Sequence, residues 1–270
     1  MSADPIKGFS VTASGSMSRD LQGRHALVTG GSRGIGLAIA SALTEAGATV
    51  SILGRDRAKL DRVVAEGCAH HAIEADVTDG LSLRRELEDA AARIGPYSIL
   101  VANAGAANSA TFSRSDDALF RRMLDVNFMG VVHAVQAVLG GMTERGFGRI
   151  VAVASTAGLK GYPYVSAYCA AKHAVVGLVR SLALETAKSG VTINAVCPGF
   201  TDTDLVAESL DNIVAKTGRS REEAIAELVK HNPQGRLIAP EEVASTVLWL
   251  CGSKAGAITG QAIAVAGGEI

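Results

Sequence analysis

The sequence predicts an α/β protein built on a single doubly wound parallel sheet with helices on both faces. From residue 24 onward, short apolar runs alternate with longer amphipathic segments, which is typical of successive βαβ units. The apolar runs are continuous and do not alternate with polar residues. Strands covered by helices on both faces have this pattern.

Strands and helices are expected in regular succession along the chain. The predicted strands cover residues 25–29, 49–53, 69–75, 98–103, 149–155, 192–197 and 262–267. The predicted helices lie near residues 35–46, 56–66, 80–94, 116–145, 163–188 and 240–251. Right-handed connections between parallel strands place these helices on the two faces of the sheet.

The domain organisation follows from where this succession begins and where it is interrupted. Residues 1–20 are rich in Ser, Gly and Ala and carry no apolar pattern, so we expect a flexible arm. We expect residues 21–270 to form a single domain. Within it, residues 201–238 hold two short helical patterns just beyond a strand. An insertion there lies over the ligand crevice of a doubly wound sheet, which predicts a substrate lid.

Composition excludes several classes of function. The 270 residues are 48% apolar and 20% charged with a net charge of −1, so we expect neither a nucleic-acid partner nor a membrane protein. The 4 cysteines form no CxxC pair, and the 6 histidines show no metal-ligand spacing. We therefore expect free thiols, no metal site and a cytoplasmic location.

The stretch TGGSRGIG, residues 29–36, follows the first predicted strand and opens the first helix. A glycine-rich turn lets the backbone approach a pyrophosphate, which the helix N-terminus stabilises. Its spacing is G-x-x-x-G-x-G, unlike the commoner G-x-G-x-x-G. The turn predicts a dinucleotide site that includes Gly30, Ser32, Arg33, Gly34, Ile35 and Gly36.

The residue after the second strand indicates which cofactor binds. A carboxylate at that position would accept a hydrogen bond from the ribose 2′-hydroxyl of NAD. The sequence has Gly54–Arg55 there instead, and Arg33 lies in the glycine turn. Two guanidiniums can bind a 2′-phosphate, so NADP is the expected cofactor and NAD the alternative.

The stretch SAYCAAK, residues 166–172, sets Tyr168 and Lys172 four positions apart in a helix-favouring run. Both side chains then lie on one helix face, one turn apart. A nearby ammonium favours the phenolate, so the pKa of Tyr168 is expected to fall toward neutrality. That predicts a general acid/base.

These motifs occur in one order that resembles the short-chain dehydrogenase/reductase family, whose fold is Rossmann-like. The ordered set is TGGSRGIG, Asp76–Val77, the NAG at 103–105, Asn127, Ser155, Tyr168 with Lys172, and the PGFTDT at 198–203. The resemblance covers nearly all of residues 21–270. It implies that Ser155 holds the substrate oxygen, that Tyr168 is the acid/base, and that Lys172 binds the nicotinamide ribose. It also implies that Asn127 anchors a proton-relay water and that further cofactor contacts come from Asp76, Val77, Asn103, Ala104, Gly105, Pro198, Gly199 and Thr203.

The expected function is hydride transfer between NADP and a ketone or secondary alcohol, in a homotetramer or homodimer. The lid and GRLIAPEEVA resemble those of 3-oxoacyl thioester reductases within the family. Apolar residues Leu159, Tyr162, Tyr164, Leu205 and Val206 and a basic rim of Lys160, Lys216, Arg219, Arg221 and Lys230 suit an acyl group on an anionic carrier. A small or cyclic ketone is the alternative substrate. A catalytically silent dinucleotide sensor is the alternative class.

Overall fold

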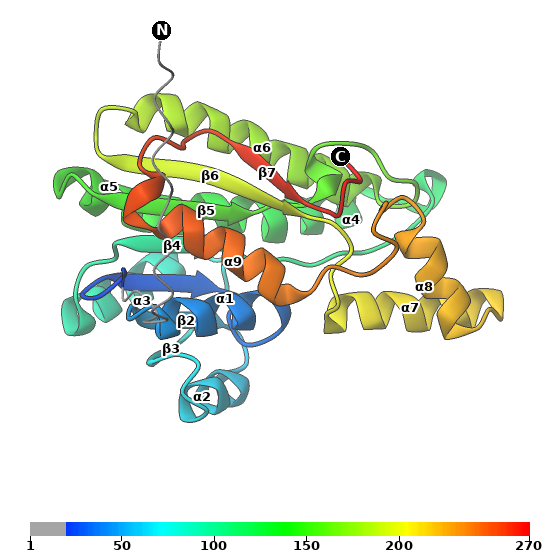
Figure 1. Ribbon diagram of the computed structural model, residues 1–270, viewed down its shortest axis with the longest axis horizontal. Coiled ribbons are helices and arrows are strands. Elements are labelled where there is room, and N and C mark those ends of the chain that lie inside the picture. The colour runs from blue at the N-terminus through cyan, green and yellow to red at the C-terminus, as the bar shows by residue number, and fades with distance from the viewer. Residues whose placement is uncertain (1–19) are drawn as a thin grey trace, which may run out of the picture.

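Seven parallel strands form one sheet, in the order β3-β2-β1-β4-β5-β6-β7 (Figure 1). The computed structural model describes residues 20–270, apart from the side chains at 205, 209, 212, 213, 216 and 217. The strands are β1 (His25–Thr29), β2 (Thr49–Gly54), β3 (His71–Glu74), β4 (Ile99–Ala102), β5 (Gly148–Val153), β6 (Val191–Pro198) and β7 (Ala262–Val265). The predicted fold class is confirmed.

Successive side chains of β4 show why the strands are apolar throughout. Ile99 and Val101 pack into the core on one face of the sheet, and Leu100 and Ala102 pack into the core on the other. All four are at most 2% exposed. Because neighbouring side chains in a strand point to opposite faces, a strand between two helical layers is apolar at every position.

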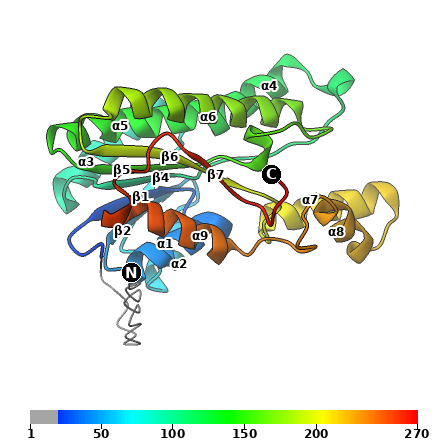
Figure 2. The same ribbon diagram turned by 45° about the horizontal axis from the view of Figure 1, so that its top comes forward.

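Helices cover both faces of the sheet, as the view in Figure 2 shows. The first layer consists of α1 (Gly34–Glu45), α2 (Arg57–Ala65) and α9 (Pro240–Cys251), and its buried residues include Ile39, Leu60 and Val243. The second layer consists of α3 (Gly80–Ile94), α5 (Gly130–Glu144) and α6 (Ser166–Thr186), with Leu83, Val135 and Val179 in the core. Single-turn helices are η1 (Phe112–Arg114), η3 (Thr156–Gly158) and η4 (Ser253–Ala255).

The helix predicted over residues 116–145 is not a uniform α-helix. It consists of α4 (Asp117–Leu124), the π-helical turn η2 (Asp125–Met129) and α5. The backbone N–H of Gly130 donates to the carbonyl of Asp125, five residues back. By length and composition, helical residues 117–144 could cross a membrane. Val131, Val135 and Val138 on this helix instead lie in the core beside the sheet.

The predicted N-terminal arm lies almost entirely outside the described part of the chain. Residues 1–19 of the predicted arm lie outside the described residues. Asp20, its last residue, accepts a hydrogen bond from the Ser253 hydroxyl at 3.1 Å.

The predicted lid holds α7 (Asp204–Thr217) and α8 (Arg221–Val229), which project beside the carboxyl edge of the sheet (Figure 1). Its two ends meet in a parallel bridge between Thr201 and Ile238, at the predicted boundaries.

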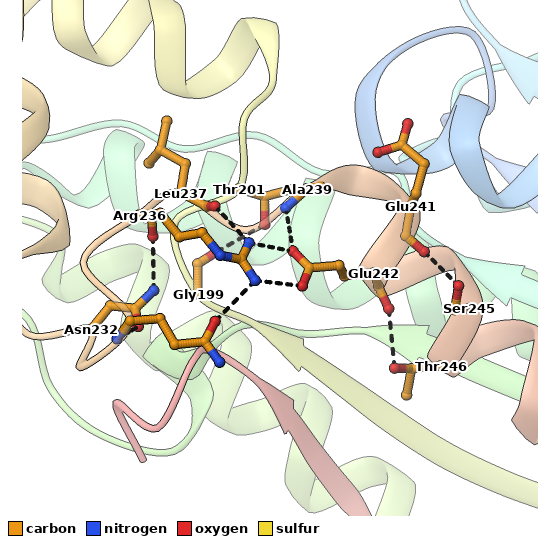
Figure 3. Close-up of polar contacts among 11 residues, drawn as sticks. Gly199, Thr201, Asn232, Arg236, Leu237, Ala239, Glu241, Glu242, Ser245 and Thr246 are labelled. Atoms are coloured by element: carbon orange, nitrogen blue, oxygen red, sulfur yellow. Dashed lines mark hydrogen bonds and ion pairs between the residues drawn. The ribbon is translucent and has the colours of Figure 1, made fainter.

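An ion pair fixes the returning end of the lid to the start of α9 (Figure 3). The two terminal nitrogens of Arg236 lie 2.6 and 2.7 Å from the two carboxylate oxygens of Glu242. Glu242 also accepts from the backbone N–H of Ala239 at 2.8 Å. The hydrogen bonds from Arg236 and Ala239 lower the pKa of Glu242 to about 2. A bidentate ion pair of this kind fixes the relative orientation of its two side chains better than a single hydrogen bond does.

We expect Glu242→Gln to loosen residues 232–239, the returning end of the lid (the lid return), without unfolding the sheet. Backbone amides of residues 232–239 should exchange with deuterium about threefold faster or more at neutral pH. The pKa of Glu242 is lowered in the folded chain. The parent's protection is therefore complete above the ordinary carboxyl pKa of ~4.3 and fades as the pH falls toward the lowered value. Hydrogen-exchange mass spectrometry measures this. Glu241→Gln, at the exposed neighbouring carboxylate, is the control, and equal exchange in both variants would contradict the prediction.

Candidate active site

The predicted site residues gather along the carboxyl edge of the sheet. β1 pairs with β2 on one side and β4 on the other, so the loops after β1 and β4 diverge toward opposite faces. A crevice at such a switch point is where doubly wound sheets bind ligands. The glycine turn follows β1, and the NAG motif follows β4.

Asn103 and Thr29 hold the two sides of this crevice together. The Asn103 side-chain amide donates to the carbonyls of Thr29 and Gly30, both at 3.1 Å. The Thr29 hydroxyl accepts from the backbone N–H groups of Asn103 and Ala104, both at 3.0 Å. Asn103 thus shapes the predicted cofactor loop through its own side chain. Thr29 was not predicted as a site residue, and nothing in its position at a strand end distinguishes it from an ordinary strand threonine.

The glycine turn is a tight backbone cradle. A Cβ on Gly36 would lie 2.1 Å from the carbonyl oxygen of Gly30. Gly34 has a φ of +52° and would place a Cβ 3.1 Å from the Thr203 side chain. The cradle therefore lies between the start of α1 and the start of the lid, with Ser32, Arg33 and Ile35 in or beside the same turn. Backbone N–H groups at a helix start in such a cradle fit a phosphate group of a dinucleotide.

The two arginines predicted to read the cofactor already have carboxylate neighbours. Arg33 lies 3.3 Å from Glu208 and 3.8 Å from Asp204, both on α7. Arg55 lies 3.8 Å from Asp76, at the end of β3. All of these side chains are at least 40% exposed, so the pairs are weak and can exchange partners.

The remaining predicted cofactor residues lie at the ends of the neighbouring strands. Val77 follows β3 and packs against the backbone at Gly130. Pro198 ends β6, and the N–H of Gly199 donates to the Val265 carbonyl at 3.0 Å. Ala104 and Gly105 follow β4. These residues and the glycine turn line one continuous edge.

Ser155 and Tyr168 come together from adjacent elements. Ser155 has an extended backbone and caps η3, where its hydroxyl accepts from the Ala157 N–H at 3.1 Å. Tyr168 lies in the first turn of α6, and its phenol lies close enough to Ser155 for the Ser155 side chain to lower its pKa. Both residues are half-buried. Two hydroxyls in contact can share one substrate oxygen.

Lys172 lies one helical turn beyond Tyr168 and is only 4% exposed. Its ammonium lies 5.7 Å from the centre of the Tyr168 ring and donates to the Val153 carbonyl at 2.9 Å. Its other two N–H groups have no protein acceptor among the described residues. A buried ammonium with unused donors is costly, so this group fits the hydroxyls of a bound ribose.

The predicted fall in the pKa of Tyr168 is wrong for the chain without ligands. Burial raises the pKa of Tyr168 to about 12, more than the hydrogen bond with Ser155 lowers it. Burial also lowers the pKa of Lys172 to about 8. Desolvation disfavours the charged form of each group, and the carbonyl of Val153 takes one donor of the ammonium. Tyr168 is therefore a neutral phenol at pH 7.

Asn127 lies within the π-helical turn and is fully buried. Its amide N–H groups donate to the carbonyls of Ala106 and Met123 at 2.9 and 3.1 Å. Its oxygen accepts from the Ala106 N–H at 3.2 Å. Both side-chain donors are used by protein carbonyls, and the proton-relay water implied by the resemblance stays a prediction. The side chain fixes the backbone at Ala106, next to Gly105, where an added Cβ would lie 3.8 Å from the Lys172 ammonium nitrogen.

The described cations of the predicted basic rim are paired with carboxylates. Ion pairs join Lys160 to Glu269, Arg219 and Lys230 to Glu227, and Arg221 to Asp211. The side chains of Lys216 and Leu205 lie outside the described residues. The four described cations of the rim share three carboxylates, because Glu227 pairs with two of them. The positive charge that the rim offers to an anionic carrier is therefore reduced.

Comparison with known proteins agrees with this geometry. The family model described as short chain dehydrogenase matches residues 24–214. The chain is 38% identical over 257 residues to 2-(S)-hydroxypropyl-CoM dehydrogenase 3 of Xanthobacter autotrophicus, covering 93% of this chain and 98% of the relative. It is 36% identical over 248 residues to the acetoacetyl-CoA reductase of Shinella zoogloeoides, covering 91% and 98%.

A crystal structure of an actinorhodin polyketide ketoreductase variant with NADPH superposes with a TM-score of 0.87 at 36% identity, covering 93% of this chain and 98% of that one. Family, fold and the ordered set of edge residues lead to the same conclusion. The chain belongs to the short-chain dehydrogenase family, and it is an oxidoreductase of the ketone/secondary alcohol class.

Proposed function

We propose that this protein uses NADPH to reduce the 3-keto group of an acyl thioester. The main support for the reductive chemistry is that Ser155 and Tyr168 lie together beside the buried ammonium of Lys172. The relatives named acetoacetyl-CoA reductase and polyketide ketoreductase support the thioester class. NADPH in the similar ketoreductase structure and the Gly54–Arg55 pair after β2 support the cofactor.

The residues of this chain have distinct roles in the proposed reduction. The cofactor, when bound, supplies the hydride. Ser155 and Tyr168 donate hydrogen bonds to the substrate oxygen, where negative charge builds in the transition state. Tyr168 then gives up its proton to that oxygen. Because Tyr168 stays protonated at pH 7, it carries the proton that this step requires.

Lys172 and Asn127 act on the surroundings of this oxygen. The unused N–H groups of Lys172 bind the nicotinamide ribose, and its charge stabilises the Tyr168 phenolate left after proton transfer. Asn127 holds the loop after β4 against the π-helical turn. The glycine turn and Thr203 bind the pyrophosphate and carboxamide ends of the cofactor, and Arg33 and Arg55 bind the 2′-phosphate.

Exposed apolar side chains on the loops after β4 and β5 suit an acyl chain. Phe112 and Tyr164 are 75% and 64% exposed, and the Ala110 N–H donates to the Tyr164 carbonyl at 2.8 Å. This contact brings the loops after β4 and β5 side by side. Tyr164 has a φ of 68°, a conformation that bulky residues rarely adopt and that often marks functional loops.

We also propose a cytoplasmic homo-oligomer. Trp249 on α9 is 50% exposed, and Leu184 on α6 is 81% exposed. The edge strand β7 pairs on one side only among the described residues. Exposed apolar side chains and a free strand edge suit contact with a second copy.

Tyr168→Phe should retain NADPH binding and lose turnover, because it removes only the proton-bearing oxygen. We expect kcat to fall by about 10²–10⁴-fold. Tyr97→Phe is the matched control, since the Tyr97 hydroxyl donates to the Leu87 carbonyl, far from the site. Steady-state kinetics and fluorescence titration of NADPH measure both. A kcat within about threefold of the parent would remove Tyr168 from the mechanism.

Arg55→Ala should weaken NADPH binding about tenfold or more while leaving NADH nearly unchanged, because the partner of Arg55 is the 2′-phosphate. Arg57→Ala is the control, since Arg57 pairs with Asp61 on its own helix and should alter neither cofactor. The measurement is Kd for each cofactor. Equal losses for NADPH and NADH, or a parent that prefers NADH, would refute the assignment.

The substrate class is tested by comparing acetoacetyl-CoA, ethyl acetoacetate and a cyclic ketone under NADPH. We expect kcat/KM for the thioester to exceed that for either carrier-free ketone by about tenfold or more, because binding of the carrier positions the keto group. Initial rates at 340 nm give this ratio. A thioester no better than the ketones would replace the thioester assignment with the small-ketone alternative.

A further inference from the structure

Glu269 carries a buried carboxylate at the substrate end of the site. Its side chain is only 3% exposed, whereas every other carboxylate in an ion pair among the described residues is at least 40% exposed. The Lys160 ammonium lies 2.9 Å from one oxygen, and the Tyr162 hydroxyl lies 2.6 Å from the same oxygen. A carboxylate is buried at such cost only with strong partners.

A directed hydrogen-bond chain runs from Glu269 toward Ser155. The Tyr162 hydroxyl lies 2.6 Å from Glu269 and 2.7 Å from the Thr156 hydroxyl. A phenol has one proton and an ionised carboxylate only accepts. The Tyr162 proton therefore goes to Glu269, and Thr156 supplies its own proton to the Tyr162 oxygen. Thr156 is 3% exposed and directly follows Ser155, so the chain ends one residue from the substrate-binding hydroxyl.

The same terminal segment also contacts the lid return. Gly267 and Gly268 have φ values of +61° and +94°, and a Cβ on Gly267 would lie 2.1 Å from the side-chain oxygen of Asn232. The Asn232 amide donates to the Arg236 carbonyl at 2.8 Å, within the lid return (Figure 3). In Figures 1 and 2 the end of the chain accordingly lies near the lid. Residues 266–269 thus touch both the loop after β5 and the lid.

We propose that Glu269 is a positioning residue for the reduction proposed above, on which this inference rests. It fixes Ser155 through Tyr162 and Thr156, and it sets the substrate loop 156–165 against the lid return. It does not touch the substrate. This role explains why Glu269 is buried although it belongs neither to the cofactor site nor to the groups that donate the proton.

The test compares Glu269→Ala, Glu269→Gln, Tyr162→Phe and the double variant Glu269→Ala/Tyr162→Phe in the full chain. Glu269→Ala and Tyr162→Phe should each lower kcat about tenfold, with Kd for NADPH within about twofold of the parent. Glu269→Gln keeps an acceptor for Tyr162 and should retain at least about a third of kcat. The double variant should lose no more than either single variant, because the chain acts as a unit.

Glu144→Ala, at an exposed glutamate that ends α5, is the matched control and should equal the parent. Parent-like kcat in Tyr162→Phe, or losses that multiply in the double variant, would overturn the proposal. Tyr162→Phe keeps the Glu269–Lys160 pair, so it decides the outcome even if Glu269→Ala fails to fold.

Hydrogen exchange provides a readout that does not depend on turnover. In the NADPH-saturated protein, Glu269→Ala should speed exchange of the amides at 156–162 about tenfold or more and leave β1 and β4 unchanged. If the parent reduces no ketone, the proposed function fails while this result still tests the positioning role. Unchanged exchange at 156–162 would overturn the role of Glu269 even in an active enzyme.

Discussion

The hydrogen bonds between Thr29 and Asn103 hold the whole site in register. They join the ends of β1 and β4, which are neighbours in the sheet. Strands β2 and β3 are added on one side of this pair and β5 to β7 on the other. Without these hydrogen bonds the glycine turn and the loop after β4 would be free to separate, because no strand pairing continues beyond the sheet edge. The cofactor cradle and the backbone near Lys172 are both built on these two loops. The backbone N–H and carbonyl groups at these strand ends thus form their hydrogen bonds with side chains, because buried backbone groups need partners.

Burial sets the electrostatics of the catalytic groups. A phenol and an ammonium in one desolvated pocket each move toward the neutral form, which keeps a proton on Tyr168 when the substrate arrives. The charge of Lys172 then has most value after proton transfer, when a phenolate faces it. In the proposed reduction, hydrogen bonds from Ser155 and Tyr168 stabilise the oxygen of the transition state.

The fold and the glycine turn could be predicted because they depend on local patterns, whereas edge residues such as Asn103 and Thr203 were implied only by the family resemblance. Continuous apolar strands and amphipathic helices specify the layers, and the lid boundaries follow from the break in this succession after Pro198. The π-helical turn at Asn127 and the Thr29–Asn103 bonds could not be predicted, since they depend on which backbone groups meet across the fold. The pKa of Tyr168, the ion pairs of the basic rim and the burial of Glu269 likewise could not be predicted, because they depend on which side chains meet in the fold. A pairing such as Lys160–Glu269 spans most of the second half of the chain.

The central claim is that the buried ammonium of Lys172 binds the cofactor and supports proton transfer from a neutral Tyr168. The most direct measurement is the pH dependence of kcat/KM for NADPH, which reports ionisations of the free enzyme. The pKa of Lys172 is lowered to about 8, so the ammonium is present below that pH and lost above it. The account predicts a parent profile that falls as the pH rises through about 8 and a low, flat profile in Lys172→Met. A flat parent profile through this range, or the same fall in Lys172→Met, would contradict it.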